Sequence, residues 1–331
     1  MQPLVKRTYT KRCLSRPSFA GECLTWLTVL ALLASCAPAH KVAATRGETP
    51  SIPSLTLVLG GDVMLGRGVA QALDGDWETA FAEVRPWLDA PTSPQMQHLV
   101  LANLESPLTA HSQVAAGYDL RAPPEAIAAL RAAGFNALSL ANNHALDAGQ
   151  IGQQETVDML QRAGILPWLA EEPATTPDLP SVIGLALDDT LAPLDLDSAA
   201  ETVAAAVAQA EVVIVSIHWG AEYQTTPSPR QREIARILSE AGASVIAGHG
   251  PHVLQPVERV GQTLVAYSLG NLLFDQPYPV DCSWGAILRV TVQGTEIVEI
   301  EAIPTVTTRG RVHLAEEETA KAILDRLGWK K

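Results

Sequence analysis

The sequence contains little cysteine, which excludes a fold held together by disulfide bonds. Its 331 residues include only four cysteines, at positions 13, 23, 36 and 282. The first three fall within the amino-terminal 36 residues, so Cys282 alone remains in the rest of the chain and cannot form an internal disulfide. About 280 residues nevertheless suffice for one large domain stabilised by its hydrophobic core.

Several common catalytic and metal-binding motifs are also missing. The chain has no CxxC or HExxH pattern, which removes structural zinc sites and the common zinc proteases. The glycine-rich stretch GGDVMLGRG (60–68) lacks the GK[ST] ending of a nucleotide-binding loop, and no GxSxG sequence is present. Serine-hydrolase and nucleoside-triphosphatase functions are therefore disfavoured.

Hydrophobic runs long enough to span a membrane are absent, and the longest run that is present indicates export. Five basic residues between Lys6 and Arg16 precede the run CLTWLTVLALL (23–33), whose 11 residues fit a signal peptide. A membrane-spanning helix needs about 20. The sequence LASC, ending at Cys36, follows directly and looks like a bacterial lipobox, although an ordinary signal peptide with a chance cysteine is the alternative. We expect residues 1–35 to be removed and Cys36 to carry lipid.

Basic residues are outnumbered by acidic ones, and processing increases the imbalance. The formal charge of the whole chain is −13, and residues 1–35 carry a net +4, so the remaining chain carries −17. This charge argues against nucleic acid as a partner. It also argues against electrostatic adhesion to anionic lipid, so we expect an extracytoplasmic lipoprotein held at the membrane by its lipid anchor. The Ala-, Pro- and Thr-rich residues 36–53 would form its flexible tether.

From residue 54 onward, short apolar runs alternate with helical patterns, which predicts an α/β domain over 54–313 with a largely parallel sheet. After about residue 253 strands follow strands, so this end should be antiparallel, and 314–331 should form a closing helix. Strands are expected at 55–60, 98–102, 136–141, 181–187, 211–217, 243–247, 263–268 and 285–293, and helices at 124–133, 150–163, 199–209 and 229–241.

Polar residues collect where five of these strands end. The five ends carry Asp62; Asn103 and Glu105; Asn142, Asn143 and His144; His218 with Glu222 after it; and His249 with His252. Each of these residues alone can be explained without a functional role, as a helix cap or a surface side chain. Because the carboxyl ends of parallel strands share one edge of the sheet, we expect these groups to converge there.

The chemistry of such a cluster is that of a metal site. Carboxylate oxygen, amide oxygen and neutral imidazole together suit divalent ions, and the mixture fits Zn, Mn or Fe better than Ca. Two such ions about 4 Å apart can clamp the attacking and leaving oxygens in phosphoester hydrolysis.

Six blocks of sequence resemble the CapA family of bacterial surface proteins, associated with poly-γ-glutamate capsule synthesis. They are GDVMLGRGV (61–69), ANLESPLT (102–109), RAPPEAIAALRAAGFNALSLANNHALDAG (121–149), HWGAEYQTTPSPRQREIA (218–235), GHGPHVLQPVE (248–258) and YSLGNLLFDQ (267–276). The resemblance implies the four-layer α/β/β/α sandwich of calcineurin-like metallophosphoesterases, with the site along one sheet edge.

The resemblance also implies roles for individual residues. Asn143 would be a metal ligand and His144 the electrophilic or acid group, because NNH resembles the phosphoesterase GNH block. Asp62 matches the first metal-binding aspartate, and Glu105 stands near the usual bridging aspartate. Three histidines, His218, His249 and His252, complete the predicted ligand set, and Glu222 is a further catalytic candidate.

Two departures from the phosphoesterase pattern affect one metal position. Met64 stands where the D-x-H block has histidine, and Gly250 stands where many CapA relatives have histidine. The GHGPH sequence separates its histidines by three residues, so they cannot occupy alternate positions on one strand.

Three functions remain open on the sequence. The first is an accessory component of capsule or poly-γ-glutamate synthesis that binds the polymer or the membrane synthase subunits. The second is a metal-dependent hydrolase of a phosphoester or related bond at the cell surface. The third is a binding or structural lipoprotein without catalysis.

Overall fold

The computed structural model describes residues 5–8, 54–89, 97–111, 118–170, 172–176 and 178–329. The predicted lipobox, Cys36 and tether lie outside these residues. One compact unit contains Met1–Tyr9 together with Pro53–Lys331. Within the described residues, no helix is both long and apolar enough to cross a membrane.

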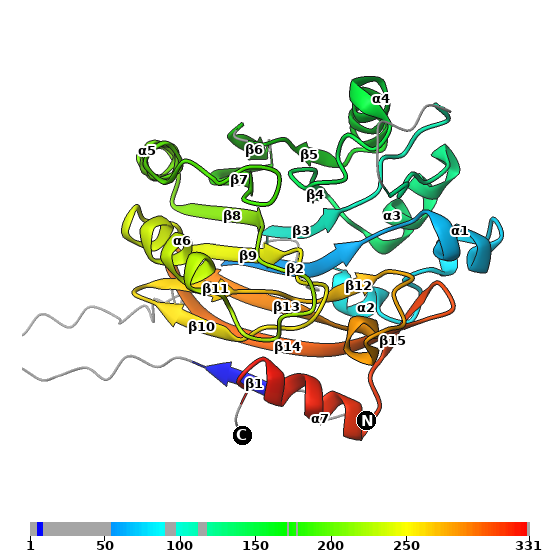
Figure 1. Cartoon of the computed structure of the whole chain (residues 1–331). Coiled ribbons are helices and arrows are strands. Elements are labelled where there is room, and N and C mark those ends of the chain that lie inside the picture. Colours follow the sequence, from blue (N-terminus) through cyan, green and yellow to red (C-terminus); the bar gives the residue numbers. More distant parts are fainter. Residues whose placement is uncertain are drawn as a thin grey trace, which may run out of the picture. The chain divides into compact units, whose positions relative to one another are not determined.

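Two β-sheets form the framework of this unit (Figure 1). In the described residues the larger has nine strands, in the order β1-β14-β13-β2-β3-β4-β5, with β12 beside β2 and β15 beside β14. Strands β2 to β5 are parallel, whereas β13 and β14 run antiparallel to their neighbours. The strands are β1 (Val5–Thr8), β2 (Ser54–Val63), β3 (Gln97–Leu104), β4 (Ala137–Ser139), β5 (Leu166–Trp168), β12 (Asn271–Leu273), β13 (Trp284–Gln293), β14 (Glu296–Thr308) and β15 (Arg311–Leu314).

The second sheet has six strands among the described residues, in the order β10-β11-β9-β8-β7-β6. Its four central strands, β11, β9, β8 and β7, are parallel, and both edge strands are antiparallel to them. The strands are β6 (Ala174–Thr176), β7 (Leu179–Asp188), β8 (Val212–His218), β9 (Val245–His249), β10 (Val257–Val260) and β11 (Thr263–Ala266).

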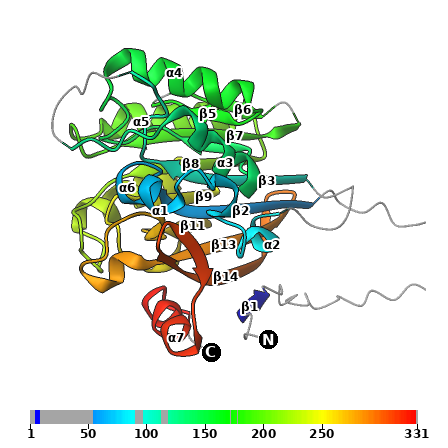
Figure 2. The same cartoon turned by 90° about the vertical axis from the view of Figure 1, so that its right-hand side faces the viewer.

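Helices cover the outer faces of the two sheets (Figures 1 and 2). Among the described residues, the face of the nine-stranded sheet carries four of these helices and the face of the six-stranded sheet carries two. They are α1 (Arg67–Leu73), α2 (Arg85–Leu88), α3 (Ile127–Ala133) and α4 (Gly149–Arg162) on the first, and α5 (Leu196–Val207) and α6 (Pro229–Glu240) on the second. Helix α6 begins with a capping box, in which the Ser228 and Gln231 side chains each bond the other's backbone N–H.

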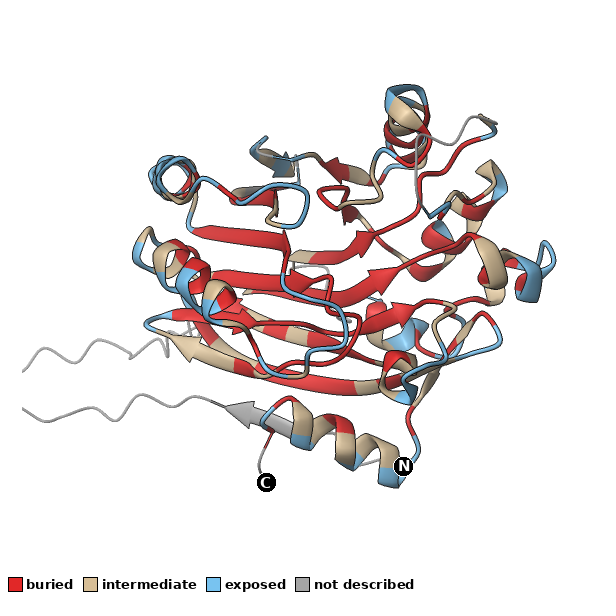
Figure 3. Ribbon diagram, in the orientation of Figure 1, coloured by how far each residue is buried: buried red, intermediate tan, exposed pale blue. Residues whose placement is uncertain are grey.

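The alternation of side chains along the strands builds three apolar layers. Leu57 and Leu59 on β2 point into the core between the sheets, with Ile214 from β8, while Val58 points to the helices on the far side. Val213 on β8 points into the third layer, beneath α5 and α6. Both faces of the central strands are therefore buried (Figure 3), which explains their nearly continuous hydrophobic sequences.

The carboxyl-terminal helix α7 (Glu317–Arg326) closes one end of the core between the sheets. Ile323 and Leu327 are fully buried there, and the Leu327 carbonyl accepts a hydrogen bond from the Val257 N–H at 3.0 Å. The helix thus belongs to the same compact unit as the strands.

At the other end of the sequence, β1 pairs antiparallel with β14, Val5 opposite Ala302 and Thr8 opposite Glu299. This strand lies within the segment predicted to be a signal peptide. Cleavage before Cys36 would therefore leave this stretch of β14 without its neighbour.

The structure confirms the α/β class and the parallel strands expected up to residue 247. The expectation of an antiparallel end beyond residue 253 is correct for β10, β13, β14 and β15. It is correct only in part for β11, which pairs antiparallel with β10 but parallel with β9, and it is wrong for β12, which pairs parallel with β2. At β12 the chain returns from one sheet to the other, a step that the local hydrophobic pattern does not reveal.

Candidate metal centre

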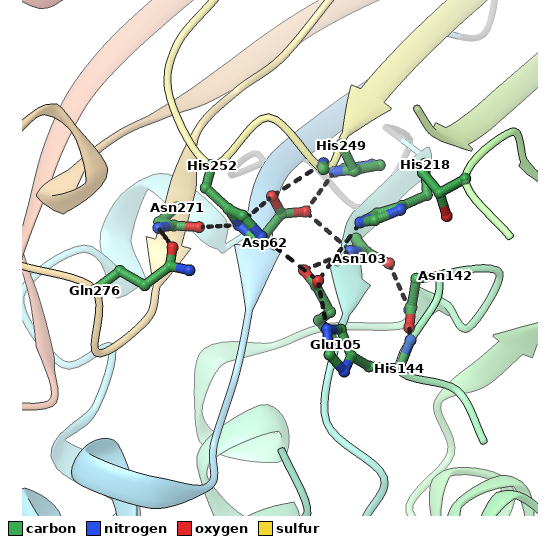
Figure 4. A network of polar contacts seen from close by, with 12 residues as sticks. Asp62, Asn103, Glu105, Asn142, His144, His218, His249, His252, Asn271 and Gln276 are labelled. Atoms are coloured by element: carbon green, nitrogen blue, oxygen red, sulfur yellow. Dashed lines mark hydrogen bonds and ion pairs between the residues drawn. The ribbon is translucent and has the colours of Figure 1, made fainter. Parts of the chain in front are cut away.

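The carboxyl ends of β2, β3, β8 and β9 meet at one edge of the two sheets. Asp62 on β2 is opposite Asn103 on β3, and His218 on β8 is opposite His249 on β9. The polar side chains at these ends form what we call the strand-end cluster (Figure 4). Its members are Asp62, Glu105, His144, His218, His249 and His252.

Two fully buried carboxylates lie at the centre of this cluster. Asp62 and Glu105 both have no solvent exposure, and the Asn103 amide lies between them. Its Nδ2 donates to Asp62 Oδ1 at 2.9 Å and lies 3.4 Å from Glu105 Oε2. The Gly250 N–H donates to the other oxygen of Asp62 at 3.2 Å. Burying two carboxylates this close is costly unless cations or hydrogen bonds compensate their charge.

Three histidines surround a single oxygen of Glu105. The Oε1 atom lies 3.5 Å from His218 Nε2, 3.7 Å from His252 Nε2 and 3.9 Å from His144 Nε2. The two oxygens of Asp62 each lie 3.4 Å from an imidazole Nδ1, one of His249 and one of His252. His252 therefore contacts both carboxylates.

A turn brings His249 and His252 to the same carboxylate. Strand β9 ends at His249, and both Gly250 (φ +101°) and His252 (φ +56°) adopt left-handed backbone conformations. The two histidines therefore do not occupy alternate positions on one strand. Their separation by three residues predicts this result. The missing side chain of Gly250 leaves room for His218, because a Cβ there would lie 3.0 Å from His218 Cε1.

Replacing Gly250 by alanine should destabilise the protein and disturb the cluster. Strained backbone alone costs about 1–3 kcal/mol, and the new Cβ also presses on the His218 ring. Gly75→Ala is the matched control, because Gly75 is also left-handed (φ +88°) but nothing lies within 4 Å of a Cβ there. Thermal denaturation should show a larger loss for Gly250→Ala, and equal losses for both variants would contradict this explanation.

The carboxylates shift the pKa values of the buried histidines. Burial lowers the pKa of His218, but the charge of Glu105 and the neighbouring Asp188 outweigh it and raise this pKa to about 10. In His252, burial is outweighed in the same way by Glu105 and Asp62, and the pKa is raised to about 9. Burial acts to raise the pKa of Asp62, yet the adjacent His249 and His252 hold it well below its usual value.

Metal binding should therefore release protons at neutral pH, because ligand imidazoles must be deprotonated. In the metal-free protein, His218 and His252 are protonated at pH 7, because both pKa values are raised. The charged rings stabilise the folded state. This contribution is complete below pH 6.5 and is lost as the pH rises through about 9 to 10. Calorimetric titration with Zn²⁺ in two buffers of different ionisation enthalpy counts the protons. About one proton per engaged imidazole is expected, and no release would contradict the assignment.

His144 is oriented by a buried aspartate. Its Nδ1 lies 3.0 Å from Asp147 Oδ2, which also accepts the Leu120 N–H at 3.0 Å. Its Nε2 therefore faces Glu105. The His144 side chain is 14% exposed, against 4% for His218 and 5% for His252, so it lies nearest to solvent.

Two of the sequence-predicted residues, Asn143 and Glu222, make no hydrogen bond or ion pair with the strand-end cluster among the described residues. Asn142, rather than Asn143, joins the network, because its Nδ2 donates to Asn103 Oδ1 at 2.9 Å. Asn143 is half-buried, with an Oδ1 that is buried and has no hydrogen-bond partner. Glu222 is exposed, and its partner is Tyr223, whose pKa is raised to about 12 by burial and by this carboxylate.

Two further residues that touch the cluster were not singled out from the sequence. Asp188, at the end of β7, is opposite His218, and its Oδ1 lies 3.8 Å from His218 Nδ1. Asn271 is opposite Asp62, and its Oδ1 lies 2.9 Å from His252 Nδ1. Asp188 marks a sixth strand that ends in a polar residue, and Asn271 lies in the block YSLGNLLFDQ, so both had a sequence signal.

The cluster has the donors and the unmet bonding capacity that a metal ion requires. Asp62, Glu105 and His252 each offer a ligand atom, all within 4.8 Å of one another. Glu105 Oε1 and both ring nitrogens of His218 and His249 are buried without a hydrogen-bond partner. Buried polar atoms in folded proteins are almost always paired, so this concentration of unpaired atoms fits a group that could hold a divalent cation.

Fold and site together define a mixed α/β protein with two sheets and a buried Asp/Glu/His cluster at their strand ends. Sequence comparison identifies its family: the model of the "Bacterial capsule synthesis protein PGA_cap" family matches residues 56–185 and 168–276. The chain belongs to this family, which confirms the resemblance to CapA proteins.

Curated relatives agree with this assignment. The PGA biosynthesis protein CapA of Bacillus subtilis is 30% identical over 264 residues, covering 70% of this chain and 68% of the relative. The capsule biosynthesis protein CapA of Bacillus anthracis is 30% identical over 253 residues, covering 67% and 60%. A probable polyglutamine synthesis accessory protein of Mycobacterium tuberculosis is 27% identical over 289 residues, covering 67% and 74%. The match thus leaves part of each relative without a counterpart.

Proposed function

We propose that this protein is a lipid-anchored, extracytoplasmic component of capsule or poly-γ-glutamate synthesis whose strand-end cluster binds a divalent metal ion. The observation that carries the proposal is the buried Glu105 Oε1, which has three imidazole Nε2 atoms within 3.9 Å and no hydrogen-bond partner. Family membership and the names of the relatives support the link to the capsule polymer or its membrane synthase subunits.

In this proposal Asp62, Glu105 and His252 hold the ion, with His218 and His249 beside them and Asn143 as the ligand that the family resemblance implies. Zn, Mn or Fe would suit these donors. A bound cation would attract carboxylate or phosphoryl oxygens of a ligand, which addresses a difficulty of charge. The processed chain is strongly acidic, so an anionic polymer is repelled unless a cation faces it.

The alternative function is hydrolysis of a phosphoester or related bond, and the placement of His144 favours it. The ring is held by Asp147 and lies nearer to solvent than the other cluster histidines. Because Nδ1 faces the Asp147 carboxylate, Nε2 can donate a hydrogen bond to a substrate oxygen that gains charge when the ring is protonated. The two sheets with helices outside are the layers expected of a calcineurin-like phosphoesterase, which supports the same alternative.

Complementation tests whether the cluster serves polymer synthesis. In a deletion strain of the native host, Glu105→Gln should fail to restore the polymer that the parent restores, because the neutral amide is a weaker metal ligand. Glu233→Gln, the same change on the exposed face of α6, should restore it. Normal polymer with correctly folded Glu105→Gln protein would show that synthesis does not need the cluster.

Replacing Cys36 by alanine should release the protein from membranes or leave it unprocessed. The proposed anchor is lipid on this cysteine, and each buried CH₂ of an acyl chain contributes about 0.8 kcal/mol. Membrane fractionation with mass analysis of the amino terminus measures both outcomes. A variant that stays at the membrane and is still cut before residue 36 would contradict the lipobox.

A further inference from the structure

Asn271 lies behind the strand-end cluster with every polar atom of its side chain engaged. It is fully buried on β12, opposite Asp62. Its Nδ2 donates to the Cys282 carbonyl oxygen at 2.9 Å and to Gln276 Oε1 at 3.2 Å. Its Oδ1 lies 2.9 Å from His252 Nδ1 (Figure 4).

These contacts fix which way the amide points. A backbone carbonyl such as that of Cys282 can only accept, so the NH₂ group of Asn271 must face it and the amide oxygen must face His252. An amide oxygen can only accept as well. The Nδ1 of His252 must therefore carry the proton, and in the neutral ring Nε2 carries the lone pair.

The lone pair then points at the centre of the cluster. His252 Nε2 is the atom that lies 3.7 Å from Glu105 Oε1. The Phe274 ring, three residues beyond Asn271, packs against the imidazole with centroids 4.9 Å apart and restricts its rotation. His252 also keeps a left-handed backbone, a strained conformation that persists only where surrounding structure holds it.

Asp62 Oδ2 lies 3.4 Å from the same Nδ1, farther than the Asn271 oxygen at 2.9 Å. We propose that Asn271 is a positioning residue that, with Asp62 as the more distant acceptor, selects the Nδ1–H tautomer of His252 and so makes Nε2 the metal-binding atom. This inference rests on the proposed metal site. The amide in turn is held by the 276–282 segment, through the Gln276 side chain and the Cys282 carbonyl. The competing explanation is that Asn271 only secures that segment.

Three variants separate the two roles. Asn271→Leu removes both the acceptor for His252 and the donor for Cys282. Asn271→Asp keeps an acceptor for His252 and loses the donor. Gln276→Ala removes one partner of the amide and leaves the Asn271–His252 hydrogen bond in place. Melting of each variant without metal shows whether it folds.

The first measurement is ring ¹⁵N NMR of metal-free protein at a pH at which the His252 ring is neutral. The parent, Asn271→Asp and Gln276→Ala should carry the proton on Nδ1. Asn271→Leu, in which Asp62 still faces Nδ1, should show a mixture of tautomers. The second is Zn²⁺ affinity, which should fall about 10–100-fold in Asn271→Leu, as is typical when an outer hydrogen-bond partner of a metal-binding histidine is lost.

The outcomes are distinct. Asn271→Asp and Gln276→Ala should keep affinity within a few fold of the parent. If Asn271→Leu keeps the Nδ1–H tautomer, or if Asn271→Asp loses as much affinity as Asn271→Leu, the positioning role is wrong. If the parent binds no metal, the proposed function fails, while the NMR result still decides what Asn271 does to His252.

Discussion

Replacing Asp62 by asparagine should remove most of the bound metal from the purified protein. This carboxylate touches His249 and His252 and accepts hydrogen bonds from Asn103 and the Gly250 backbone. A neutral amide is a poorer ligand for a divalent cation, and its NH₂ group cannot accept the donors that face it. The affinity loss should exceed the 10–100-fold typical of outer partners.

The matched control is Asp158→Asn, the same chemical change on the exposed side of α4. It should leave metal content and affinity unchanged. Metal content by elemental analysis and affinity by competition with a chromogenic chelator are the measurements. Equal metal content in Asp62→Asn and the parent, with both proteins folded, would remove Asp62 from the ligand set.

Replacing His144 by asparagine should reduce turnover steeply if the protein is a hydrolase, and metal content should stay near that of the parent. The ring is oriented by Asp147, and its Nε2 faces the cluster from the more exposed side. A donor placed against an oxygen that gains charge typically contributes 10²–10³-fold in rate, or ~3–4 kcal/mol. His313→Asn, an exposed histidine paired with Glu83, is the control.

Activity towards phosphoesters and polymer output in cells together decide what this loss means. A rate loss with metal retained supports a catalytic role for His144. If His144→Asn abolishes turnover yet restores normal polymer to a deletion strain, hydrolysis is incidental to capsule synthesis. If the metal is lost as well, His144 acts as a ligand rather than as a donor.

The cluster could be predicted from the sequence because carboxylate, amide and imidazole side chains recur at the carboxyl ends of successive parallel strands. Asp62, Glu105 and His218 each stand at or just beyond the end of an apolar run, and the structure brings their side chains together. One-dimensional pattern is sufficient here, since parallel strands deliver their carboxyl ends to one edge.

The sequence could not predict the side-chain contacts that depend on turns and on the return of the chain from the six-stranded to the nine-stranded sheet. The left-handed Gly250 and His252 bring two histidines to one carboxylate despite a spacing that forbids alternation on a strand. Asn271 reaches His252 only because β12 crosses back to pair with β2. Neither relation appears in local hydrophobic periodicity.

Met64 shows the opposite case, in which the structure explains a departure from the phosphoesterase pattern. Its side chain is fully buried in the apolar layer beneath α1 to α4. It therefore contributes to packing where a histidine would contribute a ligand. The cluster keeps four histidines without it, at positions 144, 218, 249 and 252.

Elemental analysis of the purified, processed protein, prepared without chelators, measures directly whether the strand-end cluster holds a metal ion. We expect a divalent transition metal bound stoichiometrically in the parent and in Asp158→Asn, and strongly reduced in Asp62→Asn and Glu105→Gln. Parent protein that contains no such metal, and takes up none when Zn²⁺ or Mn²⁺ is offered, would contradict this expectation.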